Sequence, residues 1–459
     1  MLRSLSLKNF KSWREVKSLR FGRITGLFGT NSSGKTSLLQ LLLLLKQTAE
    51  SADRALPLHL GDERSLVELG TFRELLHGHD LARELEWSLT WELPEPLKIV
   101  DPERQGAALY VGDELTHQAR VGWLNGSGSS GRMVTREHNY HFADATFGML
   151  AKAEKKDEFE LTPTTGKGFR FIRAQGRPWP LPAPTKCYGF PDQARGYYQN
   201  AGFLADFELA FESLFSRVFY LGPLREYPQR EYPWAGGRPS DMGRRGERVV
   251  DALLASREWG ATLSQGRGKA RLTVEERVAK WLKELKLIHD FQVTPVAPES
   301  KLYQVVVKRS AASAPVLITD VGFGVSQILP VITLCYYAPE GSVLIFEQPE
   351  IHLHPAVQAG LADVFIHAAK TRNVQIVLES HSEHLLRRLQ RRIAEEKLAT
   401  DEAALYFCDA AKTESKLVPL DMNLFGAIEN WPEDFFGDEF GELAATQEAI
   451  IQRQQRAGS

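Results

Sequence analysis

Residues 24–37 have the sequence ITGLFGTNSSGKTS, a short apolar run that leads into a glycine-rich turn. The turn matches G-x-x-x-x-G-K-[ST] in full, and a leucine-rich helix pattern begins directly after it, near Lys35. Glycines let the backbone curl so that several N–H groups face one phosphate, and the helix N-terminus adds roughly half a positive charge. An ordinary strand–helix turn is the alternative, but motif and context agree. The segment therefore predicts a phosphate-binding loop (P-loop).

Two side chains of this loop have distinct expected roles. Lys35 would reach the β- and γ-phosphates of a nucleotide, and the Thr36 hydroxyl would ligate Mg²⁺. The sequence contains no N-K-x-D motif for recognising guanine, so ATP is favoured over GTP. The residues expected to bind the nucleotide at this loop are Gly29, Thr30, Asn31, Ser32, Ser33, Gly34, Lys35, Thr36 and Ser37.

The second half of the site is expected far along the chain, at residues 343–347. Their sequence, VLIFE, predicts a buried strand that ends in Glu347, whose carboxylate would hold the Mg²⁺ shell. The order strand, helix, strand over residues 343–379 predicts a parallel β-α-β unit. An acid at the end of a buried strand is common by itself, so the assignment depends on the P-loop and on the QPEIHLHP that follows.

Two further segments fit the same pattern. Residues 321–327, VGFGVSQ, precede an apolar helix, so Gly324, Ser326 and the helix N-terminus would form a second anion cradle. A plain helix cap is the alternative. Residues 378–384, LESHSEH, end the next strand, where His381 would either hydrogen-bond a γ-phosphate or be a packed or capping histidine.

This order of segments resembles the head of ABC-type ATPases, and more narrowly the OLD-like and SMC-like heads of bacterial repair and phage-defence proteins. It is also similar to a group of AAA-type prokaryotic ATPases with a short C-terminal domain of unknown function. The resemblance covers about residues 1–80 and 205–440. The segments that carry the narrower likeness are VELGTFRELLHGHD (67–80), YLGPLREYPQREY (220–232) and NLFGAIENWPEDFFGD (423–438).

The resemblance implies an α/β P-loop NTPase fold: an ABC/SMC-like ATPase head with an antiparallel β subdomain and a helical insertion. ATP and Mg²⁺ are the implied cofactors. Gly324 and Ser326 of one subunit would close over the nucleotide of another, so the first implied partner is a second copy, with higher oligomers left open. His381 would be the switch histidine. The head dimer would regulate a separate effector such as a nuclease, in phage defence or DNA repair, and direct DNA binding is left open.

The chain departs from this family pattern next to Glu347. ABC heads usually carry Asp-Glu at this point, with the glutamate polarising the attacking water, whereas this chain has Glu347-Gln348. A neutral amide orients water but accepts no proton, and general-base catalysis is worth about 10²–10⁴-fold. Slow turnover is expected unless Glu350 takes over; the alternative is that Glu350 only shapes the dimer contact. The expected catalytic set is Glu347, Gln348, Glu350 and His381, and the expected metal-binding residues are Thr36 and Glu347.

Two functions of other classes remain as alternatives. Gln348 favours a nucleotide-gated scaffold or sensor that binds ATP and hardly hydrolyses it. A self-contained metal-dependent nuclease is the other, although no acid-rich strand pattern follows His381. A metal site is also conceivable from the spacing of four histidines, but the P-loop explains their region better. These are His352, His354, His381 and His384.

Composition and charge exclude several classes of protein. The 56 basic and 58 acidic residues give a net charge of −2, which argues against a uniformly basic nucleic-acid binder. The 43% of hydrophobic residues exclude intrinsic disorder as the main class. The three cysteines form no C-x-x-C pair, and neither a signal peptide nor an apolar run of membrane-spanning length is present. The expectation is a cytoplasmic protein with no membrane partner.

Local charge is uneven despite this balance. Arginines concentrate at 225–248, where they would line the nucleotide or a subunit interface. They concentrate again on one predicted helix face at 387–392, where they would contact phosphates or an acidic partner, or simply face solvent. Residues 421–459 are acidic and also hold aromatic residues, which argues for docking against something apolar. The expected domains are 1–81 (N-terminal part of the head, with the P-loop), 82–200 (β-rich subdomain and connector), 201–300 (helical insertion), 301–420 (C-terminal part of the head) and 421–459 (acidic/aromatic segment).

Overall fold

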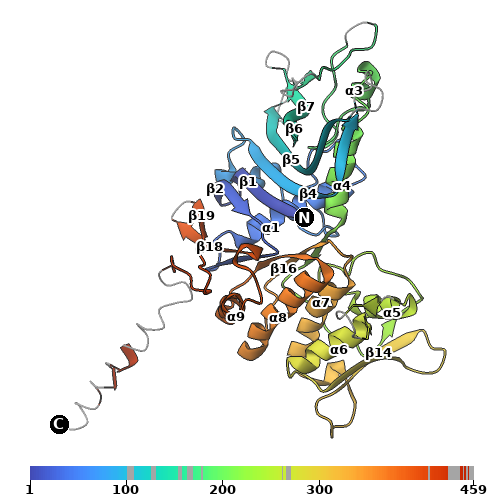
Figure 1. Cartoon of the computed structure of the whole chain (residues 1–459), viewed down its shortest axis with the longest axis vertical. Coiled ribbons are helices and arrows are strands. Elements are labelled where there is room, and N and C mark those ends of the chain that lie inside the picture. The colour runs from blue at the N-terminus through green and yellow to red at the C-terminus, as the bar shows by residue number, and fades with distance from the viewer. Residues whose placement is uncertain are drawn as a thin grey trace.

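The protein is described here from a computed structural model, which is shown in Figure 1. The residues that the structure describes are 1–100, 108–125, 131–152, 158–162, 169–176, 179–260, 262–264, 270–411, 414–432, 445–447, 449–450 and 453. The sequence of residues 125–131, NGSGSSG, predicts a flexible loop, which lies almost wholly outside these ranges, as do Phe435 and Phe436 of the C-terminal segment.

A six-stranded sheet forms the centre of the molecule, with the strand order β19-β18-β3-β17-β16-β9. All of its strand pairs are parallel except β18 with β19. The strand that leads into the P-loop therefore lies beside a strand from the far end of the chain. The bounds are β3 Ile24–Gly29, β9 Val218–Leu221, β16 Val343–Glu347, β17 Gln375–Glu379, β18 Ala403–Ala411 and β19 Glu414–Pro419.

This sheet is buried on both faces, which explains why its strands are almost continuously apolar. In β16, Val343 and Ile345 belong to one hydrophobic cluster, while Leu344 and Phe346 belong to the other. The sheet thus separates two cores. Helices α1 and α4 and a second sheet cover one face, and helices α5 to α9 cover the other. The helix bounds are α1 Lys35–Glu50, α4 Leu204–Ser216, α5 Val249–Glu258, α6 Val274–Glu284, α7 Phe323–Tyr337, α8 Pro355–Arg372 and α9 Glu383–Ala394.

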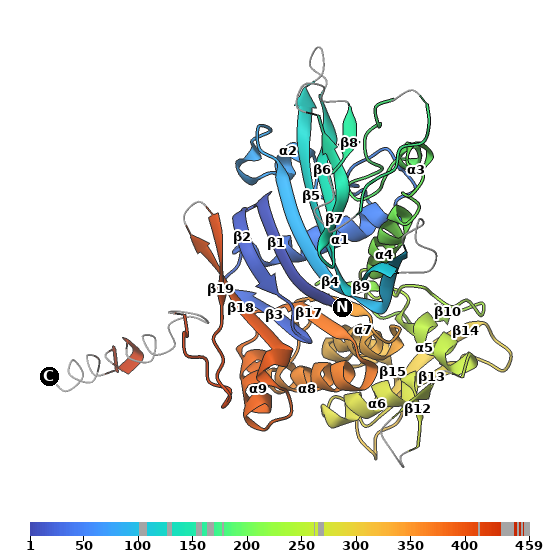
Figure 2. The same cartoon turned by 45° about the horizontal axis from the view of Figure 1, so that its top comes forward.

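The second sheet has seven strands in the order β2-β1-β4-β5-β6-β7-β8, each antiparallel to its neighbours. It curves over α1 and α4, as Figure 2 shows. Its first two strands precede the P-loop, so the head and the β-rich region share one core. The strands are β1 Leu2–Phe10, β2 Trp13–Arg20, β4 Leu85–Val100, β5 Ala108–Asn125, β6 Gly131–Phe142, β7 Ala145–Ala151 and β8 Phe159–Leu161.

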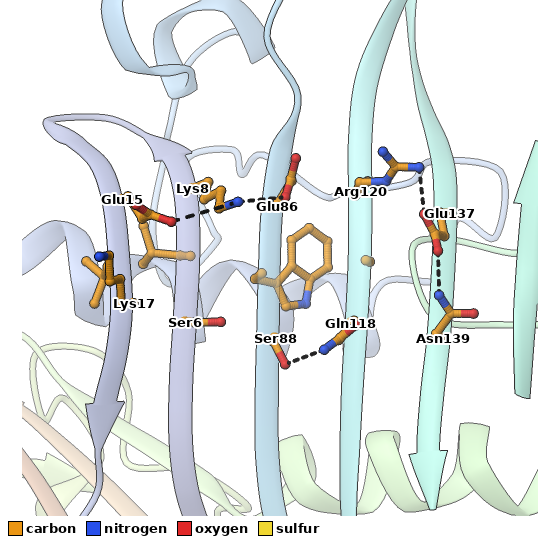
Figure 3. A pocket seen from close by; sticks show the side chains of 14 residues that line it. Ser6, Lys8, Glu15, Lys17, Glu86, Ser88, Gln118, Arg120, Glu137 and Asn139 are labelled. Carbon is orange, nitrogen blue, oxygen red and sulfur yellow. Dashed lines mark hydrogen bonds and ion pairs between the residues drawn. The ribbon is translucent and has the colours of Figure 1, made fainter. Parts of the chain in front are cut away.

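The outer face of this sheet is polar, because apolar side chains alternate inward along each strand. Figure 3 shows Lys8 between Glu15 and Glu86, and Glu137 bound by both Arg120 and Asn139. Positive and negative groups neutralise one another across neighbouring strands. Among these residues the face therefore carries no excess of positive charge that would attract nucleic acid.

The remaining elements are short. A small sheet beside α5 and α6 contains β10 Tyr232–Pro233, β13 Asp290–Pro295, β14 Leu302–Lys308 and β15 Val316–Leu317. The others are α2 Phe72–Leu75, η1 His77–His79, α3 Asp192–Tyr197, β11 Thr262–Leu263, β12 Leu272–Thr273, η2 Ile318–Asp320 and η3 Thr400–Glu402. Within the part of the chain that the structure describes, no helix is both long and apolar enough to span a bilayer.

The predicted fold class is confirmed: an α/β P-loop head with an antiparallel β subdomain and a helical insertion. The parallel β-α-β unit predicted over residues 343–379 is also present, as β16, α8 and β17. The sequence over about 383–397 also predicts a helix, and in the structure this helix, α9, ends earlier, at Ala394. In the C-terminal segment, Leu424 is 79% exposed and Phe425 is 83% exposed, so the docking of this segment against an apolar surface stays a prediction.

Gln375 joins the two sheets at the start of β17. Its side-chain amide donates to the carbonyls of Leu2 and Gly22, both at 2.9 Å, and its oxygen accepts from the N–H of Leu2 at 2.8 Å. The side chain is almost wholly buried. Three backbone groups that water does not reach are therefore satisfied by one residue.

Replacing Gln375 by Leu should lower the free energy of unfolding by about 2–4 kcal/mol. The substitution keeps most of the volume but leaves the buried backbone groups of Leu2 and Gly22 unpaired, which costs roughly 1–3 kcal/mol for each group that stays unsatisfied. Urea unfolding followed by tryptophan fluorescence would measure the change. Gln292→Leu, at an exposed position of β13, is the matched control and should shift stability by no more than about 0.5 kcal/mol. Equal effects of the two substitutions would contradict this role.

Acid should destabilise the antiparallel sheet through His138. This fully buried residue packs against Phe190, with ring centroids 4.8 Å apart, and burial lowers the pKa of His138 from 6.5 to about 3. The folded state therefore keeps the imidazole neutral while the unfolded chain protonates it. The stabilising effect is complete above pH 6.5 and is lost progressively as the pH falls toward 3.

His138→Phe should remove about 1.4 kcal/mol per pH unit from the pH dependence of unfolding over this range. Urea unfolding at several pH values below 6.5 would measure the slope. Phe190→Leu, which weakens the same packing without removing a titrating group, should lower stability equally at every pH. An unchanged slope in His138→Phe would show that another group causes the acid sensitivity.

Candidate nucleotide-binding site

The P-loop lies between two hairpins that leave no room for side chains at its glycines. Gly29 has φ +135°, and a Cβ there would lie 2.1 Å from the carbonyl oxygen of Cys408 in β18. Gly34 has φ +89°, and its Cβ would lie 2.6 Å from the hydroxyls of both Ser12 and Ser415. Both positions therefore require glycine, for conformation and for space.

The two side chains with expected phosphate and metal roles lie at the start of α1. Lys35 is buried, and its Nζ donates to the carbonyls of Thr30 at 2.6 Å and Gly29 at 3.1 Å. Burial lowers the pKa of Lys35, an effect that the nearby Glu379 carboxylate opposes. Thr36 Oγ1 donates to Glu379 Oε2 at 2.7 Å. Among the other predicted loop residues, Thr30, Asn31 and Ser32 are exposed, Ser33 is buried and Ser37 is half-buried.

Two carboxylates meet at the C-terminal ends of β16 and β17. Glu347 and Glu379 are register partners in this parallel pair, so their side chains leave the same face of the sheet. Both are buried, and Glu347 Oε1 accepts a hydrogen bond from Tyr220 OH at 3.0 Å. Burial, and then the charge of Glu379, raises the pKa of Glu347 to about 7. Burial likewise raises the pKa of Glu379.

Gln348, Glu350 and His381 surround this pair. Gln348 has a positive φ of 43°; its backbone N–H donates to the Glu379 carbonyl at 2.9 Å, and its side-chain amide hydrogen-bonds the Glu379 carboxylate. Glu350 is buried, and its Oε1 accepts the backbone N–H of His381 at 2.7 Å. The His381 ring hydrogen-bonds the backbone of Gly29, while burial and the Lys35 charge lower the pKa of His381. The fold thus gathers all four predicted catalytic residues at the C-terminal ends of β16 and β17, and His381 among them contacts the P-loop directly.

The glycine–serine segment lies at the N-terminus of α7. Ser326 Oγ donates to the carbonyl of Phe323 at 2.8 Å, so the hydroxyl bonds within the first turn of its own helix, whose N-cap residue Gly322 supplies no side-chain cap. A Cβ on Gly324 would meet only ordinary contacts, the nearest at 3.6 Å from the carbonyl of His352. Among the described residues, no hydrogen bond joins Gly324 or Ser326 to the P-loop. This segment is therefore not brought onto the P-loop of the same chain by a polar contact.

The residues present suit both ATP and Mg²⁺. The N-terminus of α1 carries no side-chain cap, which leaves its N–H groups available to phosphate. A hydroxyl and two carboxylates supply the oxygen ligands that Mg²⁺ prefers. No three His, Cys, Asp or Glu side chains form a metal group among the described residues.

Two residues of this site, Glu379 and Tyr220, were not identified from the sequence, and a third, Arg225, was expected there only as part of the arginine cluster at 225–248. Glu379 and Tyr220 contact the predicted metal ligands, and the buried Arg225 donates to the carbonyl of Glu347 at 3.3 Å. Nε and Nη1 of Arg225 find no partner in the described part of the chain, and burial lowers its pKa to about 10. Glu379 belongs to the segment 378–384, and Tyr220 and Arg225 belong to the segment 220–232. The sequence features that could have indicated them are an acid at the end of an apolar strand and a Tyr-x₄-Arg pair beside another.

The other charged and histidine clusters do not add to this site. The exposed helix face of α9 is internally paired: Arg387 contacts Glu383, Arg391 contacts Glu395, and Arg388 and Arg392 both contact Asp363. These ion pairs favour the structural interpretation of the arginine run over phosphate binding.

The four histidines are also dispersed. His352 packs on Phe323, His354 caps α8, His381 faces Gly29 and His384 is exposed.

Several solved structures that resemble this chain in fold are SMC heads. The SmcHead bound to the C-winged helix domain of ScpA is 14% identical, with a TM-score of 0.47, over 92% of this chain and 98% of that chain. The SMC head domain from Thermotoga maritima is 11% identical, with a TM-score of 0.40, over 92% and 99%. The Smc head domain with an extended coiled coil, bound to the C-terminal domain of ScpA derived from Pyrococcus furiosus, is 11% identical, with a TM-score of 0.44, over 92% and 96%. Likenesses this distant add nothing to what the strand order defines.

Three family models match parts of the chain. The one described as "AAA ATPase domain" matches residues 1–162, and "AAA domain, putative AbiEii toxin, Type IV TA system" matches residues 307–387. "Protein of unknown function (DUF3696)" matches residues 398–445. No curated protein matches the chain. The chain therefore carries an AAA-type ATPase domain whose P-loop and acidic strand lie in separate matched segments, followed by the predicted C-terminal segment of unknown function.

Proposed function

We propose that the protein binds ATP with Mg²⁺ at the P-loop and hydrolyses it slowly, and that nucleotide-driven pairing of two heads regulates a partner effector. One observation carries the nucleotide chemistry: Lys35, Thr36, Glu347, Glu350 and His381 converge on one end of the parallel sheet. A buried cluster of acid, base and phosphate-binding groups at the C-terminal edge of a parallel sheet is the usual location of such a site.

Each of these residues has a defined task in the proposal. Lys35 neutralises the β- and γ-phosphates. When nucleotide binds, its Nζ would give up its hydrogen bonds to the carbonyls of Gly29 and Thr30 and donate to phosphate oxygens instead. Thr36 and the carboxylates at the ends of β16 and β17 would hold the hydrated Mg²⁺, which neutralises phosphate charge when bound. Gln348 orients the attacking water, and Glu350 accepts its proton. His381, held near Gly29 and Lys35, hydrogen-bonds the γ-phosphate.

Glu350 is better suited than Gln348 to accept a proton. Burial raises the pKa of Glu350 above its usual value, which moves this carboxylate toward the range of an effective general base. The N–H of His381 fixes one carboxylate oxygen at 2.7 Å and so defines the direction of the other. The Gln348 amide is a neutral group hydrogen-bonded to Glu379.

Pairing of two heads would complete the site. Ser326 and Gly324 have no polar contact with the P-loop of their own chain among the described residues, so a second copy is the proposed source of the nucleotide they would cover. Two exposed aromatic side chains lie at this segment: Phe323 is 39% exposed and packs against Tyr227, which is 73% exposed, with the two ring planes tilted. Such a patch is more typical of an interface than of a free surface.

The effector and its setting rest on resemblance alone. A separate nuclease or toxin in phage defence or DNA repair fits the AAA matches at residues 1–162 and 307–387. DNA binding is less favoured, because the arginines of α9 pair with carboxylates and the outer sheet face has balanced charges.

A nucleotide-gated sensor with little hydrolysis is the second candidate, favoured by Gln348. Single-turnover hydrolysis of ATP with and without DNA separates it from the ATPase, because a sensor would retain bound ATP over many minutes in both conditions.

Glu350→Gln should reduce the ATPase rate more than Gln348→Ala does. Loss of a general base costs about 10²–10⁴-fold, whereas an orienting amide is partly replaced by water. Steady-state phosphate release at saturating Mg·ATP would measure both rates. Glu340→Gln, a carboxylate on the opposite side of the sheet that pairs with Arg372, is the control and should keep the wild-type rate. The reverse ranking of the first two variants would contradict the assignment of Glu350.

Ser326→Arg should abolish ATP-dependent dimerisation while the monomer still binds ATP, because a bulky cation would block the proposed contact with the partner's nucleotide. Light scattering after gel filtration, with and without Mg·ATP, would measure the mass. Ser313→Arg, in the turn before β15, is the matched control and should dimerise normally. Mixing Ser326→Arg with Lys35→Ala should restore part of the ATPase activity through one intact composite site. Dimerisation of Ser326→Arg at wild-type ATP concentrations would refute a role in trans.

A further inference from the structure

The strand order places Glu379, and not Glu347, next to the P-loop. Strand β17 pairs with β3 on one side and with β16 on the other, so Glu379 lies one strand from the loop and Glu347 lies two strands away. The Glu379 carboxylate contacts the Thr36 hydroxyl at 2.7 Å. The Glu347 carboxylate is instead held by Tyr220 at 3.0 Å.

From this arrangement we propose that Glu379 is a direct protein ligand of the nucleotide-bound Mg²⁺, beside Thr36, and that Glu347 acts one layer further out through water. The inference rests on the proposed nucleotide binding and assigns the metal to a residue that the acidic-strand pattern does not indicate.

The distance between the two oxygens suits a shared ion. Mg²⁺ takes octahedral oxygen ligands at about 2.0–2.1 Å, so two adjacent ligands of one ion are about 2.9 Å apart. Thr36 Oγ1 and Glu379 Oε2 are separated by 2.7 Å. Only a small adjustment of either side chain is needed for both oxygens to contact one ion.

The charges around Glu379 support the same role. Glu379 is 3% exposed and Glu347 is 6% exposed, and the two residues are register partners on neighbouring strands. Two buried carboxylates so placed repel one another, and Lys35 is the nearby cation that most offsets the charge of Glu379. A divalent ion at Thr36 would offset both negative charges where burial makes their repulsion strong.

The proposal also accounts for Gln348. The side-chain amide of Gln348 hydrogen-bonds the Glu379 carboxylate, so this one group contacts both the Thr36 hydroxyl and the residue that occupies the usual glutamate position. An acid at both 348 and 379 would place another carboxylate, at a half-buried position, in direct contact with this acidic pair. A neutral amide at position 348 therefore avoids charge repulsion with the carboxylate of Glu379.

Mn²⁺ serves as the probe, because its electron paramagnetic resonance signal reports bound and free ion without any turnover. The full-length protein is titrated with Mn²⁺ at saturating ADP, and ADP affinity is measured separately in EDTA. Glu379→Gln should bind ADP in EDTA within about twofold of wild type and should lose at least about tenfold in Mn²⁺ affinity. Glu379→Asp, which keeps the carboxylate on a shorter side chain, should recover part of that affinity.

Two comparisons decide the outcome. Glu347→Gln should lose less Mn²⁺ affinity than Glu379→Gln, and Glu340→Gln should lose none. The inference is overturned if Glu379→Gln retains Mn²⁺ within about twofold while binding ADP normally, or if Glu347→Gln has the larger loss. Failure of the wild-type protein to bind ADP would instead refute the proposed function, and this inference with it.

Discussion

The hydrogen bond from Thr36 to Glu379 connects the P-loop with a strand that comes from the far end of the chain. It depends on the parallel register in which Glu379 pairs with Leu27 of β3 and with Glu347 of β16. Because side chains alternate along a strand, a shift of β17 by one residue would turn Glu379 to the opposite face. That shift would separate Thr36 from its partner and would also dissolve the acidic pair. The site therefore exists only in one register of the central sheet.

Burial on both faces of the central sheet maintains this register. Val343 and Ile345 enter one core while Leu344 and Phe346 enter the other. A shift of this strand by one residue would therefore move each side chain into the other core, where it does not fit. Strands β3 and β17 come from opposite ends of the chain, and Gln375 ties the start of β17 to residues that precede the P-loop. The ATPase domain is consequently one folding unit with a long insertion, although its two family matches are separated in sequence. Charge is balanced locally as well as over the whole chain, because clustered arginines such as Arg392 pair with carboxylates within the fold.

Local patterns were sufficient for the P-loop, for the strand that ends in Glu347 and for the strand that precedes His381. Each has a short-range physical cause: glycine where φ is positive, apolar continuity where a strand is buried twice, and a polar group where the strand ends. The same reasoning did not identify Glu379 and Tyr220, and it placed Arg225 only within a cluster, because a glutamate, tyrosine or arginine beside a strand is common. Only pairing across the sheet shows that these three side chains contact the P-loop threonine and Glu347. The arginines of α9 illustrate the converse, since their carboxylate partners include Asp363, which no local pattern connects to them.

Sequence alone thus defined the chemistry that the chain carries: a phosphate loop, its lysine and threonine, and a set of acids and a histidine at strand ends. These follow from residue types within a few positions of one another, where backbone geometry is local. The tertiary structure decided which acid lies beside Thr36, and it assigned the arginines of α9 to ion pairs within the fold. Those outcomes depend on strand order and register between segments far apart in the chain. They are set by the joint burial of two cores and not by any segment taken singly.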